Sequence, residues 1–145
     1  MARDFFTVIE KQQIRQAILD AEKKTTGEIQ VHLERHARKP LAERAREVFG
    51  ILGVSRTKAR NGVLFYLAIE DHQFAVLGDS GIDKVVPPGF WDQIREHMEH
   101  LFRQGRFTEG LCDGIRMAGD QLAEYFPISQ HDENELPDDI SFGNQ

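Results

Sequence analysis

The chain has 145 residues, 40% of them hydrophobic, which suits one ordinary domain with a single core. Its formal net charge of −6 argues against a general nucleic-acid-binding protein. The one cysteine, Cys112, excludes an intramolecular disulfide and a metal site built on several cysteines. No apolar run approaches the roughly 18 residues that a membrane span needs, and the N-terminus is unlike a signal peptide. We therefore expect a cytoplasmic monomer without stable membrane insertion and without a nucleic-acid partner.

The first part of the chain predicts a helix, a strand and a second helix. Thr7 followed by Glu10 fits a capping box and indicates a helix over residues 7–24. Residues 28–35 alternate between apolar and polar side chains, which is typical of a strand with one partly solvated face. Residues 40–53 form a second amphipathic helix that starts with a proline. The polar side chains of the strand are Gln30, His32 and Glu34.

A buried strand and a hairpin follow. Seven consecutive apolar residues over 63–69 predict a strand that is buried on both faces. A polar tetrapeptide separates it from a second apolar run at 74–77, which indicates a tight hairpin. A turn centred on residues 71–72 places residues 61–62 beside residues 80–82. The preceding strand–helix–strand order predicts a parallel pair with a right-handed crossover.

The last part of the chain predicts two helices and a tail. The helices cover residues 90–104 and 107–126, and Pro127 ends the second one. We expect residues 1–128 to form a single domain and residues 129–145 to form an acidic C-terminal tail, whose composition is typical of disorder. The apolar residues of this tail, which a solvated segment does not need, are Leu136, Ile140 and Phe142.

Three polar loops are predicted to meet at one end of the sheet. Residues 27–28 open the first strand, residues 61–62 open the second, and residues 79–83 leave the third. Because the first two strands run parallel and the third runs antiparallel to them, these three loops lie at the same end. Carboxylate and amide oxygens suit Ca²⁺, with Mg²⁺ as the alternative divalent cation. The candidate metal ligands are Glu28, Asn61, Asp79, Asp83 and Asp113, the last of them from the final helix.

The same residues also fit structural roles, so both interpretations stay open at this point. Asp79 with its following residues can form a turn, Asp83 can cap a helix, and Glu28 can lie at a solvated strand end. The sequence assigns no catalytic residue, because it contains neither a P-loop nor a Gly-x-Ser-x-Gly nucleophile elbow.

A basic region lies between the first and second predicted strands. Residues 35–60 contain eight Lys and Arg residues against two Glu residues. This basic face fits an anionic protein partner or membrane surface, an anionic ligand, docking of the acidic tail, or merely a solvated surface. Arg60 lies beside the candidate site and is the residue that we expect to bind phosphate or another anion. A metal-dependent acid phosphatase is therefore the alternative function, with Asp79 as its nucleophile or metal ligand.

An ordered series of short motifs resembles the TPM-domain family, and the resemblance covers nearly the whole chain. The motifs are Thr26-Gly27-Glu28-Ile29-Gln30-Val31, Arg60-Asn61-Gly62-Val63-Leu64, Gly78-Asp79-Ser80-Gly81-Ile82 and Phe107-x-x-Gly110. The chain resembles in particular the short bacterial members that lack a signal peptide and a transmembrane helix. These members are also similar to it over residues 134–143.

This resemblance implies a fold and a range of functions. The implied fold is of the α/β class, a three-layer, Rossmann-like α/β/α sandwich in which about four helices flank a small mixed β-sheet. Family members are described either as acid phosphatases or as Ca²⁺-binding proteins without phosphatase activity. The resemblance also implies that residues 136–142 dock on the domain. We therefore predict a Ca²⁺-binding, non-catalytic interaction or regulatory module.

Overall fold

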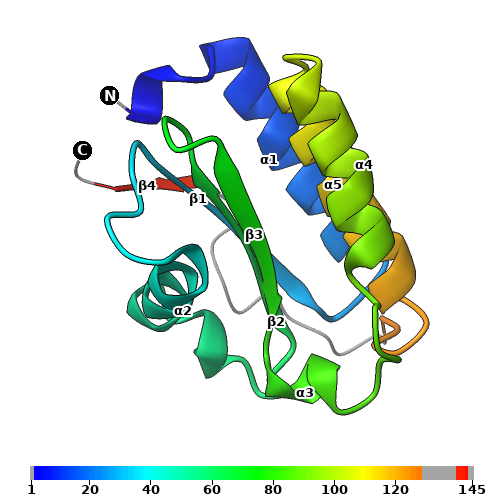
Figure 1. Ribbon diagram of the computed structural model, residues 1–145. Helices are drawn as coiled ribbons and strands as arrows, with labels where there is room; N and C mark the ends of the chain where they lie inside the picture. Colours follow the sequence, from blue (N-terminus) through cyan, green and yellow to red (C-terminus); the bar gives the residue numbers. More distant parts are fainter. Residues whose placement is uncertain (1, 129–139, 144–145) are drawn as a thin grey trace.

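A four-stranded mixed sheet lies between two helical layers (Figure 1). The computed structural model describes residues 2–128 and 140–143. The strand order is β3-β2-β1-β4, in which β1 pairs parallel with both β2 and β4, and β2 pairs antiparallel with β3. The strands are β1 (Glu28–Glu34), β2 (Gly62–Ala68), β3 (Gln73–Gly78) and β4 (Ile140–Phe142).

Three helices cover one face of the sheet and a single helix covers the other (Figure 1). The α1, α4 and α5 layer packs on the larger core cluster, and α2 packs on the smaller one. This arrangement confirms the predicted α/β sandwich. The helices are α1 (Val8–Glu22), α2 (Leu41–Ile51), α3 (Ser80–Asp83), α4 (Asp92–Arg103) and α5 (Phe107–Leu122), with 3₁₀ turns at Ala2–Asp4 and Val54–Arg56.

Local sequence signals explain where the helices begin and how closely they pack. The Thr7 hydroxyl accepts a hydrogen bond from the Glu10 amide at 3.1 Å, and the Glu10 carboxylate accepts one from the Thr7 amide at 2.9 Å, which confirms the predicted capping box. In α5, a Cβ atom on Gly114 would lie 2.5 Å from the sulfur of Met98. This glycine therefore lets α5 approach α4.

The hairpin register differs by two residues from the predicted one. Val63 faces Gly78, so Gly62 lies opposite Asp79 and not beside residues 80–82. The loop spans residues 69–72 and is closed by a 3.2 Å hydrogen bond from the His72 amide to the Ile69 carbonyl. A left-handed His72, with φ of 54°, completes this turn, which lies about one residue earlier than the sequence predicted.

The prediction of a solvated face on the first strand is wrong, because all seven residues of β1 are buried. The cover includes α2, which follows β1 in the chain, and β4 at the sheet edge, which lies more than 100 residues further on. Arg44 of α2 and Tyr66 of β2 both hydrogen bond to Glu34, and Ser141 of β4 lies 2.8 Å from a ring nitrogen of His32. Charged and polar groups thus fill this face.

The end of the chain contributes to the sheet. Val31, His32 and Leu33 of β1 pair with residues 140–142. The Gly143 amide continues the pairing with a 2.9 Å hydrogen bond to the Leu33 carbonyl. Leu136, the other apolar residue noted in the tail, falls outside the described residues, as do residues 129–139 generally. Within residues 2–128 and 140–143, no helix has the length and apolar character needed to cross a membrane.

Candidate functional site

Glu28, Gly62 and Asp79 lie in one row across the end of the sheet. Glu28 pairs with Gly62, and the Asp79 amide donates a 3.0 Å hydrogen bond to the Gly62 carbonyl. Neighbouring strands are about 4.8 Å apart, so the backbones of Glu28 and Asp79 are separated by roughly 10 Å. Loops that are far apart in the chain therefore meet at this end, as the topology predicted.

The strand alternation directs this row toward the α2 side of the sheet. Ile29 and Val63 belong to the core beneath α1, α4 and α5, so Glu28 and Gly62 point the other way. A Cβ atom on Gly62 would lie 2.4 Å from the Val54 carbonyl oxygen, which places that oxygen directly over the glycine. The absence of a side chain at Gly62 thus brings a backbone oxygen between the two acidic positions.

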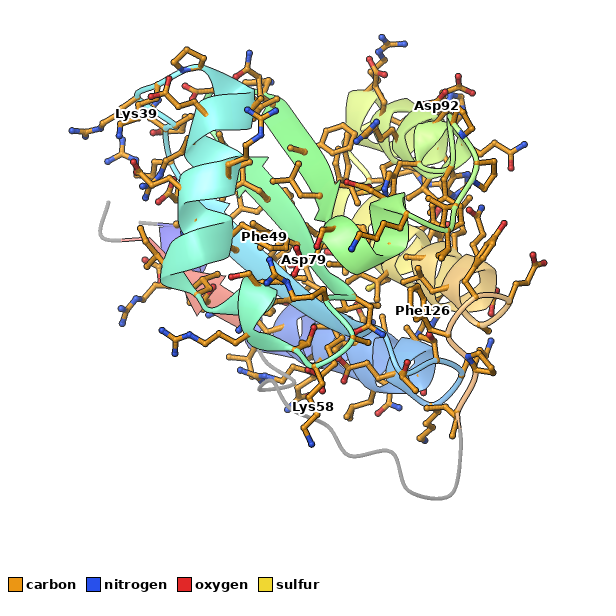
Figure 2. The ribbon with its side chains drawn as sticks, turned by 90° about the horizontal axis from the view of Figure 1, so that it is seen from below. Lys39, Phe49, Lys58, Asp79, Asp92 and Phe126 are labelled. Atoms are coloured by element: carbon orange, nitrogen blue, oxygen red, sulfur yellow. The ribbon has the colours of Figure 1, made fainter. Side chains whose placement is uncertain are left out.

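Asp79 is fixed by two hydrogen bonds that use both of its carboxylate oxygens. Oδ1 accepts from the Ser80 amide at 2.7 Å, which caps the short helix α3. Oδ2 accepts from Nε of Arg60 at 3.0 Å. Asp79 is 7% exposed and Glu28 is 3% exposed, so both carboxylates are largely withdrawn from solvent. In Figure 2 Asp79 lies beside α3, at the end of the sheet.

Arg60 reaches Asp79 because two turns pack backbone against backbone. The Gly81 amide donates a 2.8 Å hydrogen bond to the Arg60 carbonyl, and a Cβ atom on Gly81 would lie 2.1 Å from the Ala59 carbonyl oxygen. Arg60 itself has φ of 52°, a left-handed conformation that is uncommon outside glycine. Its side chain is 55% exposed, so the guanidinium covers the outer side of Asp79.

Asn61 ties the beginnings of β1 and β2 together. Its amide donates to the Thr57 hydroxyl at 3.1 Å, and its side-chain Nδ2 donates to the Thr26 hydroxyl at 3.0 Å. Its carbonyl accepts from the Glu28 amide at 3.4 Å. Since Nδ2 serves as the donor, Oδ1 is the side-chain atom of Asn61 that can ligate a cation.

The structure separates the other two predicted ligands from this row. Asp83 lies at the end of α3, one turn after Asp79, and is exposed; it lines another cavity of about 280 Å³ near residues 86–92. Asp113 lies on α5, on the opposite face of the sheet from α2, and its carboxylate is 2.8 Å from Nε2 of His97. We therefore assign the candidate site to Glu28, Asn61 and Asp79.

The chemistry of this site is that of hard oxygen donors. Within the part of the chain that the structure describes, no three His, Cys, Asp or Glu side chains form a group that could hold a metal ion. A cation bound here would use neutral oxygens beside the two carboxylates, as Ca²⁺ commonly does. Sequence reasoning missed the Thr26 and Thr57 hydroxyls that position Asn61, and the Val54 carbonyl, for which a sequence pattern carries no signal.

Comparisons with known proteins agree with this architecture. The family model of the TPM domain matches residues 2–121. The NMR structure of the BA42 protein from the psychrophilic bacterium Bizionia argentinensis is 48% identical, with a TM-score of 0.92 and 97% of each chain covered. The N-terminal domain of the cg2496 protein from Corynebacterium glutamicum shares the fold at 10% identity and a TM-score of 0.64, covering 97% of this chain and 83% of that one. The search of curated proteins found no match. The chain belongs to the TPM-domain family.

Proposed function

We propose that this protein is a divalent-cation-binding domain, with Ca²⁺ as its ion, that acts as a non-catalytic interaction or regulatory module. The observation that carries the proposal is the row at the end of the sheet, where two carboxylates with little solvent exposure flank a glycine. A positive charge stabilises carboxylates that are withdrawn from solvent. Arg60 supplies such a charge to Asp79, and a divalent cation bound at the row would add to it.

The donor set favours Ca²⁺ over Mg²⁺. The site combines the Glu28 carboxylate, at the start of β1, with the Asp79 carboxylate, the Asn61 amide and the Val54 carbonyl, which lie in the loops beside it. Ca²⁺ accepts six to eight oxygens in flexible arrangements, whereas Mg²⁺ requires a nearly ideal octahedron. We expect selectivity for Ca²⁺ on this ground.

A role in binding also fits the one cysteine, whose chemistry is unsuited to nucleophilic catalysis. Cys112 is buried on α5, and burial raises the pKa of its thiol to about 11. The thiol therefore stays protonated near neutral pH, and the thiolate needed for attack is scarce.

The basic region supports an anionic protein partner. Some of its charges are compensated within the protein, as in the pairs of Arg35 with Glu70 and Lys39 with Glu47. Others lie exposed on and around α2 and are suited to an anionic surface. These exposed cations are Arg38, Arg46 and Arg56.

Titration with Ca²⁺ and with Mg²⁺, followed by backbone amide shifts, tests the proposal. We expect Ca²⁺ to move the amides of Asn61, Gly62 and Asp79 at concentrations on the order of millimolar or below. Asp79→Asn weakens binding by about tenfold, because it removes one ligand charge. Asp92→Asn on the exposed start of α4 is the matched control and leaves binding unchanged. Amides at the site that stay still in millimolar Ca²⁺ contradict the proposal.

The contact between Arg60 and Asp79 gives the phosphatase alternative its one specific support. An exposed guanidinium beside a carboxylate can hold a phosphate next to a metal-bound or nucleophilic oxygen. Turnover of an aryl phosphate by the wild type, lost in Asp79→Asn and unchanged in Asp92→Asn, supports this function. Turnover that is equal in all three proteins comes from a contaminant.

A further inference from the structure

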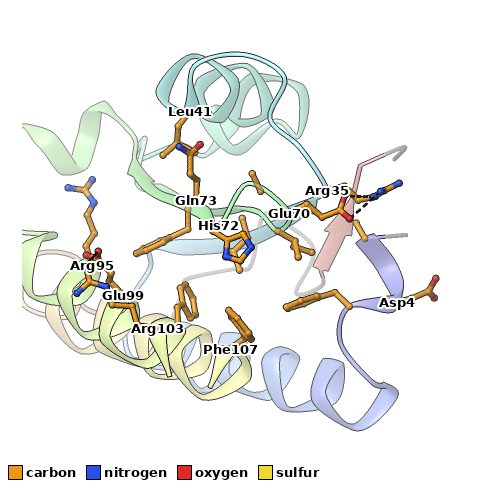
Figure 3. Close-up of a pocket in the computed structure, with 17 residues that line it drawn as sticks. Asp4, Arg35, Leu41, Glu70, His72, Gln73, Arg95, Glu99, Arg103 and Phe107 are labelled. Carbon is orange, nitrogen blue, oxygen red and sulfur yellow. Dashed lines mark hydrogen bonds and ion pairs between the residues drawn. The ribbon is translucent and has the colours of Figure 1, made fainter. Parts of the chain in front are cut away.

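A hollow larger than the cavity beside Asp83 lies at the other end of the sheet from the cation site. Its volume is about 910 Å³, and it runs between the β2–β3 hairpin, the N-terminal segment and the α4–α5 turn (Figure 3). Neither Glu28, Asn61 nor Asp79 lines it. This volume falls within the range of small-molecule pockets, which is about 300–1,000 Å³.

A continuous strip of aromatic rings forms the apolar wall of this groove. The strip runs from Phe5 through Phe107 and Phe102 to Phe74, with successive ring centroids 5.3, 5.7 and 5.1 Å apart. The four rings come from the N-terminal segment, α5, α4 and β3, and all of them line the groove. Because Phe5 is 36% exposed, part of this strip remains open to solvent.

The arginines that line the groove differ in how closely an acidic side chain neutralises their charge. Arg35 bonds to Glu70 and Arg103 bonds to Glu99, each at 2.6 Å, so these pairs are close to neutral. Arg95 has no ion pair as short as these among the described residues.

Among the described residues, the hydrogen bond of the Arg95 guanidinium goes to a neutral group, the Val76 carbonyl, at 2.9 Å. Its described ion pair, with the exposed Asp92, is loose at 3.9 Å. Asp4, another acidic residue of the lining, lies at the far end of the groove from Arg95 (Figure 3). Arg95 is therefore the least closely compensated of the three arginines that line the groove.

Helical spacing places this charge in line with the aromatic strip. Arg95 and Phe102 are seven residues apart on α4, so they share one face of the helix about 10 Å apart along its axis. An anionic head at Arg95 and an apolar body over Phe102 would therefore be separated by the length of a small amphipathic molecule.

We propose that this groove is a binding site for a small amphipathic anion. The apolar body of the ligand lies on the strip of Phe5, Phe74, Phe102 and Phe107, and its carboxylate or sulfonate pairs with Arg95. This site is independent of the cation site, so its test stands whether or not Ca²⁺ binds.

Two fluorescent probes of similar shape test the proposal. 8-Anilinonaphthalene-1-sulfonate carries an anionic head, and N-phenyl-1-naphthylamine is its uncharged counterpart. We expect both to bind the natively folded protein and to shift the amides of Phe74, Phe102 and Phe107. Arg95→Gln weakens binding of the sulfonate about three- to tenfold and leaves the uncharged probe unaffected. Decanoate, an aliphatic carboxylate, displaces the sulfonate.

A matched variant and a second contact site complete the experiment. Arg116→Gln, on an exposed part of α5 that does not line the groove, removes the same charge and leaves both affinities unchanged. Phe5→Ser weakens both probes, because it shortens the aromatic strip at its exposed end. Three results would overturn the proposal. The affinity for the sulfonate falls equally in Arg95→Gln and Arg116→Gln, the amide shifts are confined to other parts of the protein, or neither probe binds.

Discussion

The Tyr66 hydroxyl on β2 donates a 2.6 Å hydrogen bond to the carboxylate of Glu34, the last residue of β1, so the contact joins the two central strands of the sheet. Glu34 is 1% exposed and also accepts from Nε of Arg44 at 2.9 Å and from Nη2 of the same side chain. A single carboxylate thereby joins two strands to α2. Removing the Glu34 carboxylate takes away the partner of the Tyr66 hydroxyl and the buried partner of Arg44, which keeps only its ion pair with the more exposed Glu47.

We predict that Glu34→Gln lowers the free energy of unfolding by about 3 kcal/mol, because it leaves the Arg44 cation without its buried counter-charge. Tyr66→Phe removes one hydrogen bond to a charged group and costs about 1.5–3 kcal/mol. Urea denaturation measures both losses. Glu99→Gln, which breaks the exposed pair with Arg103, is the control and changes stability by less than about 1 kcal/mol. A loss no larger in Glu34→Gln than in this control contradicts the prediction.

The same network predicts that acid destabilises the fold in two steps. Burial lowers the pKa of His32 below its ordinary value of 6.5, so the unfolded chain binds this proton more readily. Burial alone would raise the pKa of Glu34, but hydrogen bonds from Arg44 and Tyr66 outweigh it and lower the pKa from 4.5 to about 2. In both cases the folded state holds fewer protons, so stability is complete above the ordinary pKa and falls as the pH drops below it.

Urea midpoints measured between about pH 7 and pH 5 isolate the His32 step, because Glu34 is ionised in both states over most of this range. We expect the midpoint to fall toward pH 5 in the wild type and to fall less in His32→Gln. His100→Gln, at an exposed position on α4, retains the slope of the wild type. A slope that is the same in all three proteins shows that His32 does not contribute to it.

Periodic patterns and caps predicted most of the elements, because those signals are local. The capping box of Thr7 and Glu10 and the apolar run of β2 needed no distant partner. The burial of His32 and Glu34 could not be predicted in this way. Their cover comes from α2 and β4, and a short strand such as Ile140–Phe142 has no pattern of its own.

The part of the candidate site that depends on strand order could be predicted from the sequence. Parallel pairing of β1 with β2 and the following hairpin brought Glu28, Asn61 and Asp79 to one end of the sheet. Which helical layer each remaining candidate lies in determined whether it reaches the site. Asp113 lies on a helix of the opposite layer, and strand order does not reveal which face a later helix covers.

The close approach at Gly81 predicts a large effect from a single methyl group. Gly81→Ala places a Cβ atom 2.1 Å from the Ala59 carbonyl oxygen, so the turn that carries Asp79 must move away from Arg60. We expect a loss of about 2–4 kcal/mol in the free energy of unfolding. Gly50→Ala, in α2 with open space around the new methyl group, gains up to about 1 kcal/mol instead. Thermal or urea denaturation of the two variants checks both signs, and equal effects contradict the packing argument.

The ion pair between Arg60 and Asp79 predicts how the proposed Ca²⁺ site responds to a change of charge. The Arg60 guanidinium holds Oδ2 of Asp79 and must give up that contact, or share it, when a cation binds the same carboxylate. Arg60→Gln therefore strengthens Ca²⁺ binding, by about tenfold for a pair that is partly shielded from solvent. Calorimetric titration with Ca²⁺ measures the change.

Arg46→Gln separates this local competition from a general effect of net charge. Arg46 lies exposed on α2, and its substitution removes the same single charge without touching Asp79. If the more negative net charge alone attracts Ca²⁺, binding becomes stronger by the same factor in the two variants, and the gain fades as salt screens it. Direct competition strengthens binding in Arg60→Gln alone and persists at high salt. Weaker binding in Arg60→Gln would instead mean that Arg60 holds Asp79 in the orientation that the cation needs.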